Sequence, residues 1–256
     1  MPTAPTSPAA EQLPARTAAV WAALDPLVGA GTPLRVLDVG GGSGMFAVPL
    51  ARLGHDVTVV DPSADALATL RRRADVAGVG NRVRGMQGDG DLLHEVLTNG
   101  GGGNAGYDLA LCHSVLEVVD DPAVTLTEIA AALRPGGQVS VATANRAGAV
   151  LARALGGHPV EALGLFRDAD PDPAPAPAPG RGRPEHRRFS PADLLALVEG
   201  AGLRPGPWRG ISVVADLLDA SSGADPAGVR ALELALTDTS PYRDIATGLH
   251  VLAVRP

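Results

Sequence analysis

The chain has 256 residues, 45% of them hydrophobic, and a formal net charge of −7. This is enough apolar material for one full-sized core, so we expect a single domain with appended elements. The acidic balance argues against broad nonspecific binding to nucleic acid, and no DNA partner is expected, although a local basic patch is compatible with it. The single cysteine, Cys112, cannot form an intrachain disulfide and is expected to pack in the core.

Nothing at the N-terminus predicts secretion. Residues 1–10 are rich in Pro, Ala and Thr and lack a basic start followed by an apolar stretch, so we expect a disordered end rather than a signal peptide. No uncharged apolar run reaches membrane-spanning length. We therefore expect a cytoplasmic protein without a membrane partner. The composition does not predict the number of subunits.

The first predicted elements are a helix and a strand. Residues 11–29 show helical spacing of apolar side chains, with Arg16 between them. After a turn with glycine and proline, the β-branched run at 36–39 predicts a buried parallel strand. A glycine loop follows, and an amphipathic segment at 45–53 predicts the next helix. The loop contains Gly40, Gly41, Gly42 and Gly44.

The spacing of this loop separates two kinds of ligand. A dinucleotide fingerprint, G-x-G-x-x-G counted from Gly40, requires glycine at position 45, where the chain has Met45. Counted from the acid, the chain reads D-x-G-x-G-x-G starting at Asp38. This pattern resembles the first motif of the class I methyltransferases that use S-adenosylmethionine (SAM). In that family the acid and the loop hold the amino-acid end of the cofactor.

A second acid closes the next predicted strand, at 57–60. Asp61 lies about twenty residues beyond the glycine loop, where an acid is placed to accept both ribose hydroxyls of a nucleoside. The alternative is a helix cap, since Pro62 and the serine after it open a predicted helix at 64–77. Both roles are compatible, and the preceding glycine loop favours the ribose role.

A third acid follows the short predicted strand at 83–86. Gly88 and Asp89 come directly after it, and the resemblance to class I methyltransferases implies that Asp89 accepts the adenine amino group. Asp91 is the competing residue, and it is also placed to cap a predicted helix at 92–97.

The fourth predicted strand, 107–112, ends at His113. Ligands of open parallel sheets lie beyond the carboxyl ends of the strands near the topological switch point, so His113 is expected to face the methyl donor. Three roles stay open for this histidine: general base, hydrogen-bond partner of the substrate, or a ring packed on the cofactor. The uncharged, glycine-rich loop at 99–106 is predicted to be a mobile surface insertion.

A helix at 123–133 and a strand at 138–143 follow. The Leu-Arg-Pro-Gly-Gly turn between them resembles the same superfamily. Asn145 and Arg146 come directly after the strand, so we expect them above the carboxyl edge of the sheet.

Residues 147–189 are the unusual part of the chain. Segments at 150–155 and 160–166 have helical spacing, and 168–182 is a Pro- and Ala-rich tether of polyproline type. We predict that 147–189 is a lid that excludes water from the reaction. A basic cluster ends it, for which a solvated loop is the alternative reading. Its members are Arg181, Arg183, His186, Arg187 and Arg188.

The rest of the chain predicts helices at 192–201 and 226–236 and strands at 208–218 and 249–254, the two strands pairing as an antiparallel edge. The predicted fold class is therefore α/β: a Rossmann-like class I methyltransferase with a seven-stranded, mostly parallel sheet, an antiparallel edge strand and helices on both faces. Residues 11–256 would form this single domain.

Five strings in the C-terminal third resemble a narrower group, the tRNA 5-carboxymethoxyuridine methyltransferases (CmoM/SmtA-like). Those enzymes methylate the carboxylate of a modified uridine at the tRNA wobble position, so the resemblance implies tRNA as the partner. The strings lie at 187–191, 208–213, 232–234, 240–243 and 249–253.

The resemblance also implies roles for single residues. Arg16 would grip the carboxylate of the cofactor, and Gly40 and Gly42 would line its methionine end. The other cofactor-binding candidates are Asp38, Gly41, Gly44, Asp61, Pro62, Gly88, Asp89 and His113. The substrate-side candidates are Asn145, Arg146, Arg188 and Tyr242, and the catalytic candidates are His113, Arg188 and Tyr242.

A carboxylate acceptor needs no general base because it is already ionised at pH 7. The alternative is an O- or N-methyltransferase of a small metabolite, in which a hydroxyl or ammonium must lose a proton and His113 becomes essential. The three acids argue against a cofactor-binding module without catalysis, and Met45 against a nicotinamide dehydrogenase. Scattered histidines and the lack of cysteine-rich spacing predict no metal site.

Overall fold

The computed structural model describes residues 14–100, 106–167, 187–218 and 223–256. The strands are β1 (Arg35–Val39), β2 (Asp56–Asp61), β3 (Val83–Gln87), β4 (Tyr107–His113), β5 (Leu133–Ala144), β6 (Arg204–Ile211) and β7 (Gly248–Val254). The α-helices are α1 (Ala18–Val28), α2 (Ala47–Arg52), α3 (Ala64–Val76), α4 (Leu93–Asn99), α5 (Pro122–Ala132), α6 (Arg146–Leu155), α7 (Pro159–Arg167), α8 (Pro191–Gly200) and α9 (Pro226–Leu236). Short 3-10 helices are η2 (Ala15–Thr17), η3 (Gly80–Arg82), η4 (Gly90–Leu92) and η5 (Arg243–Ile245).

Several predictions concern residues outside this description. These are the disordered end at 1–10, most of the glycine-rich loop at 99–106, the tether at 168–182, and Arg181, Arg183 and His186 of the basic cluster.

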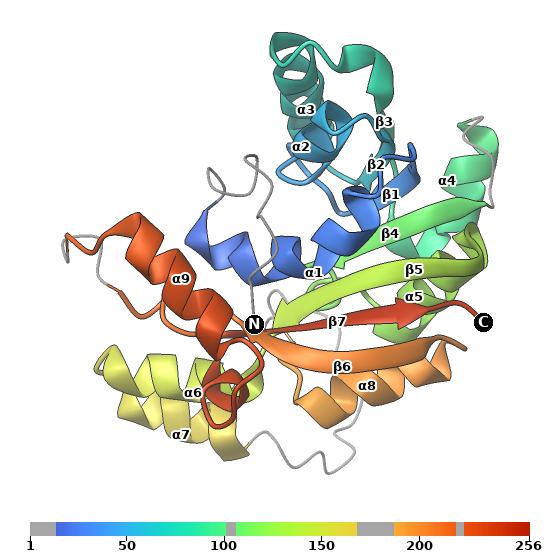
Figure 1. Cartoon of the computed structure of the whole chain (residues 1–256). Helices are drawn as coiled ribbons and strands as arrows, with labels where there is room; N and C mark the ends of the chain where they lie inside the picture. Colours follow the sequence, from blue (N-terminus) through green and yellow to red (C-terminus); the bar gives the residue numbers. More distant parts are fainter. Residues whose placement is uncertain (1–13, 101–105, 168–186, 219–222) are drawn as a thin grey trace.

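The strands form one sheet in the order β3-β2-β1-β4-β5-β7-β6 (Figure 1). β1 pairs parallel with β2 and β4, β2 with β3, and β4 with β5, whereas β7 pairs antiparallel with β5 and with β6. The predicted seven-stranded, mostly parallel sheet with antiparallel pairing towards one edge is confirmed. The strand order reverses between β1 and β4, which makes this pair the topological switch point.

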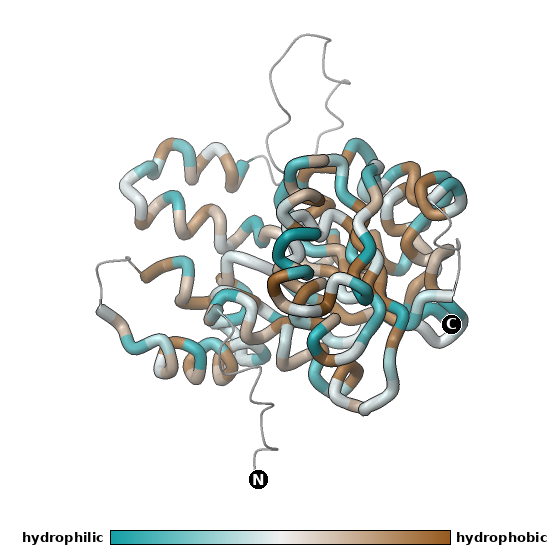
Figure 2. Tube along the Cα trace, turned by 90° about the horizontal axis from the view of Figure 1, so that it is seen from above, coloured by the Kyte–Doolittle hydropathy of each residue, from teal (hydrophilic) through white to brown (hydrophobic). Residues whose placement is uncertain are grey.

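Helices cover both faces of the sheet, as predicted. The central strand β4 contacts both helical layers, which explains why its sequence is almost wholly apolar. Leu109 and Leu111 pack into a cluster with side chains of α1, α2 and α3, while Ala110 and Cys112 pack into a second cluster with α4, α5 and α8. Cys112 is a buried thiol in this core. A parallel strand between two helical layers needs apolar residues at every position, and apolar residues gather along the middle of the molecule in Figure 2.

The predicted strand at 208–218 is wrong at both ends. β6 starts earlier, at Arg204, because an edge strand tolerates prolines such as Pro205. It stops at Ile211 because Ser212 adopts a positive φ of 55°, which no strand continues through. β6 therefore ends at the carboxyl edge of the sheet, opposite the first residue of β7.

The described ends of the predicted lid are fixed to the sheet. α6 and α7 lie side by side (Figure 1) and follow directly from the end of β5. The chain returns at Phe189, whose N–H donates to Ala144 O at 2.9 Å and whose carbonyl accepts from the Arg146 N–H at 3.0 Å. Gly148 places α6 against the backbone of Ala246, which a Cβ at position 148 would approach to 2.1 Å. The lid role of 147–189 stays a prediction.

Candidate functional site

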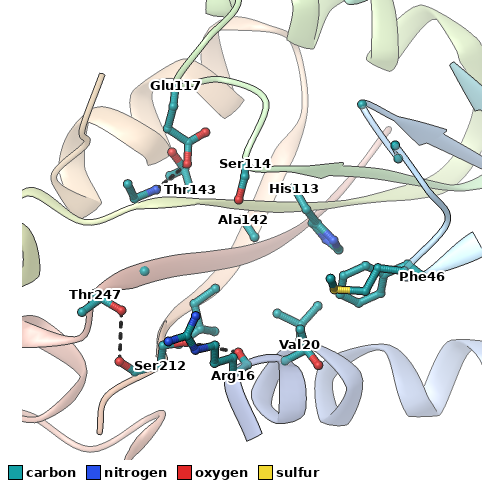
Figure 3. A pocket seen from close by; sticks show the side chains of 18 of the residues that line it. Arg16, Val20, Phe46, His113, Ser114, Glu117, Ala142, Thr143, Ser212 and Thr247 are labelled. Carbon is teal, nitrogen blue, oxygen red and sulfur yellow. Dashed lines mark hydrogen bonds between the residues drawn. The ribbon is translucent and has the colours of Figure 1, made fainter. Parts of the chain in front are cut away.

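A cavity of about 520 Å³ lies where several strands end. Its wall consists of the glycine loop after β1, the last residues of β4 and β5, the turn after β6 and the first residue of β7, with η2 and α1 on one side (Figure 3). This volume is in the range of small-molecule sites. The cavity lies at the switch point between β1 and β4, where open α/β sheets bind their ligands.

The acid of the glycine motif, Asp38, is part of this wall. Its side chain is buried, and its Oδ2 has no hydrogen-bond partner among the described residues. Burial, followed by the nearby charge of Asp61, raises the pKa of Asp38 to about 7. Gly40 and Gly42 have positive φ angles of 67° and 54°, and a Cβ at Gly41 would stand 2.5 Å from the Asp38 carboxyl carbon. A side chain at position 41 would therefore collide with the carboxyl group of Asp38.

Asp61 supports this loop from the end of β2. Its Oδ2 accepts from the Gly42 N–H at 2.9 Å and its Oδ1 from the Ser63 N–H at 2.9 Å. The side chain that caps α3 is that of Ser63, not that of Asp61, for which this role was the alternative. Pro62 is exposed, and Gly44, with φ of 81°, packs against α3 rather than lining the cavity.

The third acid, Asp89, lies apart from the main cavity. It is exposed and lines a separate hollow of about 550 Å³ together with Gly88. The predicted cap at Asp91 is wrong: Asp89 Oδ1 accepts from the Asp91 N–H at 3.3 Å and caps η4. The Asp91 carboxylate instead accepts from the hydroxyl of Thr125 and so ties η4 to α5.

His113, at the end of β4, belongs to the cavity wall and is held by other rings and by a serine. Phe46 lies edge-on to the His113 ring with centroids 4.6 Å apart. His113 Nε2 lies 2.8 Å from Ser140 Oγ on β5, and Ser140 Oγ lies 2.8 Å from His250 Nε2 on β7. Burial lowers the pKa of His113 to about 4. The histidine is therefore neutral near pH 7 and is a weak base.

Arg16 reaches the cavity from η2. Its Nε lies 2.7 Å from Asp216 Oδ1, and 66% of its side chain is exposed. Asp216 also accepts from Thr247 Oγ1 at 2.5 Å, and Ser212 Oγ donates to the Arg16 carbonyl at 3.3 Å. The turn after β6 thus connects the N-terminal helix region to the start of β7 (Figure 3).

Two of the substrate-side candidates, Arg146 and Arg188, lie together in a second cavity, of about 640 Å³, between α8 and the first residues of α5 and α6. Arg146 donates to the Arg188 carbonyl at 3.2 Å and to Asp193 Oδ2 at 3.3 Å. Arg187, beside them, donates through Nη2 to the Asp120 carbonyl at 2.8 Å. Neither Arg146 nor Arg188 lines the main cavity.

The other two substrate-side candidates are not brought to either cavity. Asn145 is fully buried: its amide donates to the carbonyls of Asp244 (3.0 Å) and Ala246 (2.8 Å), and its Oδ1 caps α6. The expectation that it faces a substrate is corrected, because its polar atoms hold η5 and α6 in place. Tyr242 is 46% exposed at the start of η5 and lines neither cavity.

Ser140 and His250 were not among the candidate residues. His250 is the one polar residue of β7, which is a signal that the sequence does contain, whereas β5 has other polar residues besides Ser140. Their contact, however, depends on the pairing of β5 with β7, in which Ala142 is opposite His250. Ser140 and His250 are 110 positions apart in the sequence, so the sequence alone does not predict which residues of the two strands are opposite each other.

None of the helices in the described part of the chain is both long and apolar enough to cross a membrane. In the same residues, no cluster of three or more His, Cys, Asp or Glu side chains is placed to hold a metal ion.

Residues 10–205 match a protein-family model described as a methyltransferase domain. The chain belongs to the class I SAM-dependent methyltransferases. Its sheet order and the glycine motif at the switch point agree with this assignment.

Curated relatives of this methyltransferase have two kinds of acceptor in their names. It is 33% identical over 146 residues to the tRNA 5-carboxymethoxyuridine methyltransferase of Escherichia coli, which covers 56% of this chain and 53% of that protein. It is 32% identical over 178 residues to the ubiquinone biosynthesis O-methyltransferase of Aeromonas salmonicida, covering 69% and 66%. The match to the first of these thus spans about half the length of that relative.

Solved structures support the fold. The magnesium protoporphyrin IX methyltransferase of Synechocystis, with bound S-adenosylhomocysteine (SAH), matches with a TM-score of 0.57 at 17% identity, covering 94% of this chain and 82% of that one. The cyclase SpnF matches with a TM-score of 0.53 at 21% identity, covering 91% and 81%. One fold therefore carries different reactions, and the acceptor must be argued from the site.

Proposed function

We propose that this methyltransferase transfers a methyl group from SAM to the carboxylate of 5-carboxymethoxyuridine in tRNA, giving a methyl ester. The proposed site is the cavity at the ends of β1, β4 and β5. The proposed cofactor-binding residues are Arg16, Asp38, Gly40, Gly41, Gly42, Gly44, Asp61, Pro62, Gly88, Asp89 and His113, and Arg146, Arg188 and Tyr242 are kept as substrate-side proposals.

The charges of the wall fit the amino-acid end of SAM. The buried carboxyl of Asp38 has an oxygen without a partner among the described residues, and an ammonium group beside it would compensate the cost of its burial. The exposed guanidinium of Arg16 suits a carboxylate, for which it offers paired N–H donors. Asp61 is the last residue of β2, and Asp89 follows the end of the neighbouring strand β3, which supports ribose and adenine roles at increasing distance from Asp38.

The burial of His113, together with the contact of its Nε2 with Ser140 Oγ, is the observation that carries the choice of acceptor. The pKa of its ring is lowered to about 4 by burial, so it is poorly matched to removing a proton from a hydroxyl or ammonium near pH 7. A carboxylate has no proton to lose at that pH. The relative from Escherichia coli, named for a tRNA carboxymethoxyuridine, supports the same choice.

The work left to the chain is positioning and exclusion of water. SAM, when bound, supplies a methyl group activated by a positively charged sulfur. The cavity wall must hold the acceptor in line with that methyl group, since most of the acceleration available comes from orientation. An anion and a cation that react to neutral products gain from a dry site. We propose that α6, α7 and the returning segment at Phe189 provide this exclusion.

The proposal is tested with SAM that carries a labelled methyl group. The protein is incubated with bulk tRNA and, separately, with the small-molecule fraction of a cell extract. The expected result is label in tRNA that mild alkali releases, as an ester would be. Label in tRNA that resists alkali, or label confined to small molecules, would overturn the carboxylate proposal.

The second candidate is an O-methyltransferase of a small metabolite, favoured by the ubiquinone biosynthesis relatives. A hydroxyl acceptor needs a base, and loss of a general base costs about 10²–10⁴-fold in rate. The His113→Ala substitution separates the candidates. A carboxylate methyltransferase keeps much of its kcat, whereas an O-methyltransferase that uses His113 as base loses activity over that range.

A further inference from the structure

Three neighbouring strands place His113, Ser140 and His250 on one line. His113 and His250 are both opposite Ala142 of β5, one from β4 and one from β7, and Ser140 lies two residues before Ala142 on the same side of the strand. The small side chain of Ala142 leaves the ring centroids of the two histidines 6.3 Å apart. The serine hydroxyl bridges the gap with two contacts of 2.8 Å.

The hydroxyl of Ser140 has one proton for two ring nitrogens. Burial lowers the pKa of both histidines, with further lowering of that of His250 by His113 and Arg209, so both rings are neutral. A neutral imidazole has one N–H and one bare nitrogen. Ser140 can therefore donate to one Nε2 and accept from the other, or accept from both and keep its own proton unbound.

Every one of these arrangements leaves one buried donor without a partner, because Nδ1 of both histidines has no partner among the described residues. An unsatisfied buried donor costs about 1–3 kcal/mol. If Ser140 donates to His250, the orphan N–H is the Nδ1–H of His250, which is fully buried and does not line the cavity. If Ser140 donates to His113, the orphan is the Nδ1–H of His113, which belongs to the cavity wall. Of these two arrangements, only this one leaves the orphan donor on a residue of the cavity wall, where a bound ligand could become its partner.

We propose that Ser140 and His250 are positioning residues that hold His113 as the Nδ1–H tautomer, so that His113 gives a hydrogen bond to the methyl acceptor instead of taking its proton. In this arrangement His250 Nε2–H donates to Ser140 Oγ, and the Ser140 hydroxyl donates to His113 Nε2. The His113 Nδ1–H then points its proton at an acceptor oxygen. The rings of Phe46 and Trp21, stacked 5.1 Å apart, pack on the His113 side of this network.

This deepens the proposed function and rests on it for the identity of the acceptor. A donor suits a carboxylate, because it orients one oxygen and leaves the other free to attack the methyl group. It does not suit a hydroxyl acceptor, which needs a bare nitrogen to take its proton.

The tautomers are tested directly by NMR on the unmodified protein, with ring nitrogens labelled and SAH bound. His55 is an internal reference: its Nδ1 accepts from the Leu34 N–H at 3.1 Å, so its Nε2–H must donate to the Val28 carbonyl at 3.1 Å. The expected result is an Nε2–H signal for His55 and His250 and an Nδ1–H signal for His113. An Nε2–H tautomer for His113 would overturn the proposal.

Two variants give a kinetic test. Asparagine at 113 places an amide N–H near the position of Nδ1, so His113→Asn should keep kcat within about tenfold and leave the pH profile flat above about pH 6, whereas loss of a base would cost about 10²–10⁴-fold. Ser140→Ala should raise the acceptor KM several-fold without changing the affinity for SAH. Thr237→Val, which removes another buried hydroxyl, is the control and should leave that KM unchanged. An unchanged KM in Ser140→Ala contradicts the positioning role.

The two proposals fail separately. The tautomer measurement needs no acceptor, so an Nδ1–H signal at His113 with no label transferred to tRNA would leave the network standing and remove the tRNA proposal. Alkali-labile label in tRNA with an Nε2–H signal at His113 would do the reverse.

Discussion

Arg16 Nε lies 2.7 Å from Asp216 Oδ1, and this ion pair joins η2 to the turn after β6. Both side chains line the main cavity. The pair is largely open to solvent on the Arg16 side, with 66% of that side chain exposed, so it contributes less than about 1 kcal/mol to stability. Arg16 can therefore leave Asp216 for a ligand carboxylate at little cost.

Replacing Arg16 tests its proposed grip on the cofactor. Arg16→Ala should weaken SAH binding about tenfold or more, because a hydrogen bond to a charged group is lost, and should scarcely change the melting temperature. Arg153→Ala removes a comparably exposed ion pair, with Glu161, and is the control. Titration calorimetry measures both. Equal SAH affinity in the two variants would mean that Arg16 is only a surface charge.

A glycine of the glycine loop and a glycine outside it form a matched pair for alanine substitution. Gly40 and Gly54 both have positive φ angles, 67° and 99°, so alanine is strained by about 1–2 kcal/mol at either position. Only Gly40 lines the cavity; a Cβ there would meet Val115 Cγ2 at 2.4 Å, while a Cβ at Gly54 meets nothing within 4 Å. Gly40→Ala should lose SAH binding, and Gly54→Ala should lose stability alone. The comparison needs thermal denaturation alongside the SAH titration.

The raised pKa of Asp38 predicts how SAH binding depends on pH. An ammonium group favours the ionised acid, so binding should lower this pKa from about 7, release a proton and become tighter between about pH 5.5 and 7.5. Without ligand, the pKa is raised above its ordinary value of 3.8, so the contribution of Asp38 to folding stability is lost as the pH rises through about 7. Calorimetry in buffers of different ionisation enthalpy counts the proton. Asp38→Asn should abolish the release; a release that persists would place it elsewhere.

The contact of α6 with the end of the sheet can be disturbed without touching the cofactor loop. Gly148→Ala puts a methyl group 2.1 Å from Ala246 O and should cost about 1–3 kcal/mol, shift α6 and raise the acceptor KM. Gly164→Ala, on α7, meets nothing within 4 Å and should stabilise the helix by up to about 1 kcal/mol. If α6 and α7 form the lid, only Gly148→Ala changes that KM, and SAH affinity stays constant in both. An unchanged acceptor KM in Gly148→Ala would argue against the lid.

Local signals made most of the fold predictable. The helix after Asp121 was expected within a residue of α5, because Asp121 caps it and Pro122 fixes its first turn. Where several polar residues compete, the choice depended on contacts: Asp89 rather than Asp91 caps η4, since Asp91 is engaged by Thr125. The end of β6 was missed because the positive φ of Ser212 leaves no mark in an apolar run.

In the site, too, the features with a local sequence signal could be predicted, whereas those that depend on tertiary contacts could not. Asp38 and its glycines could be predicted because the motif is contiguous, and their place in the cavity follows from the strand that carries them. Asn145 was predicted from its position after a strand, and only the structure shows that η5 and α6 use its amide. The bridge from His113 through Ser140 to His250 depends on the register of three strands, which long-range packing determines.

In the proposed reaction the methyl group ends on a carboxylate of tRNA. The most direct measurement is mass spectrometry of the nucleosides from tRNA that contains 5-carboxymethoxyuridine, after incubation with this protein and SAM. We expect this nucleoside to gain one methyl group and to lose it again in mild alkali. If the nucleoside keeps its original mass while another nucleoside or a free metabolite gains the methyl group, this protein does not methylate that carboxylate.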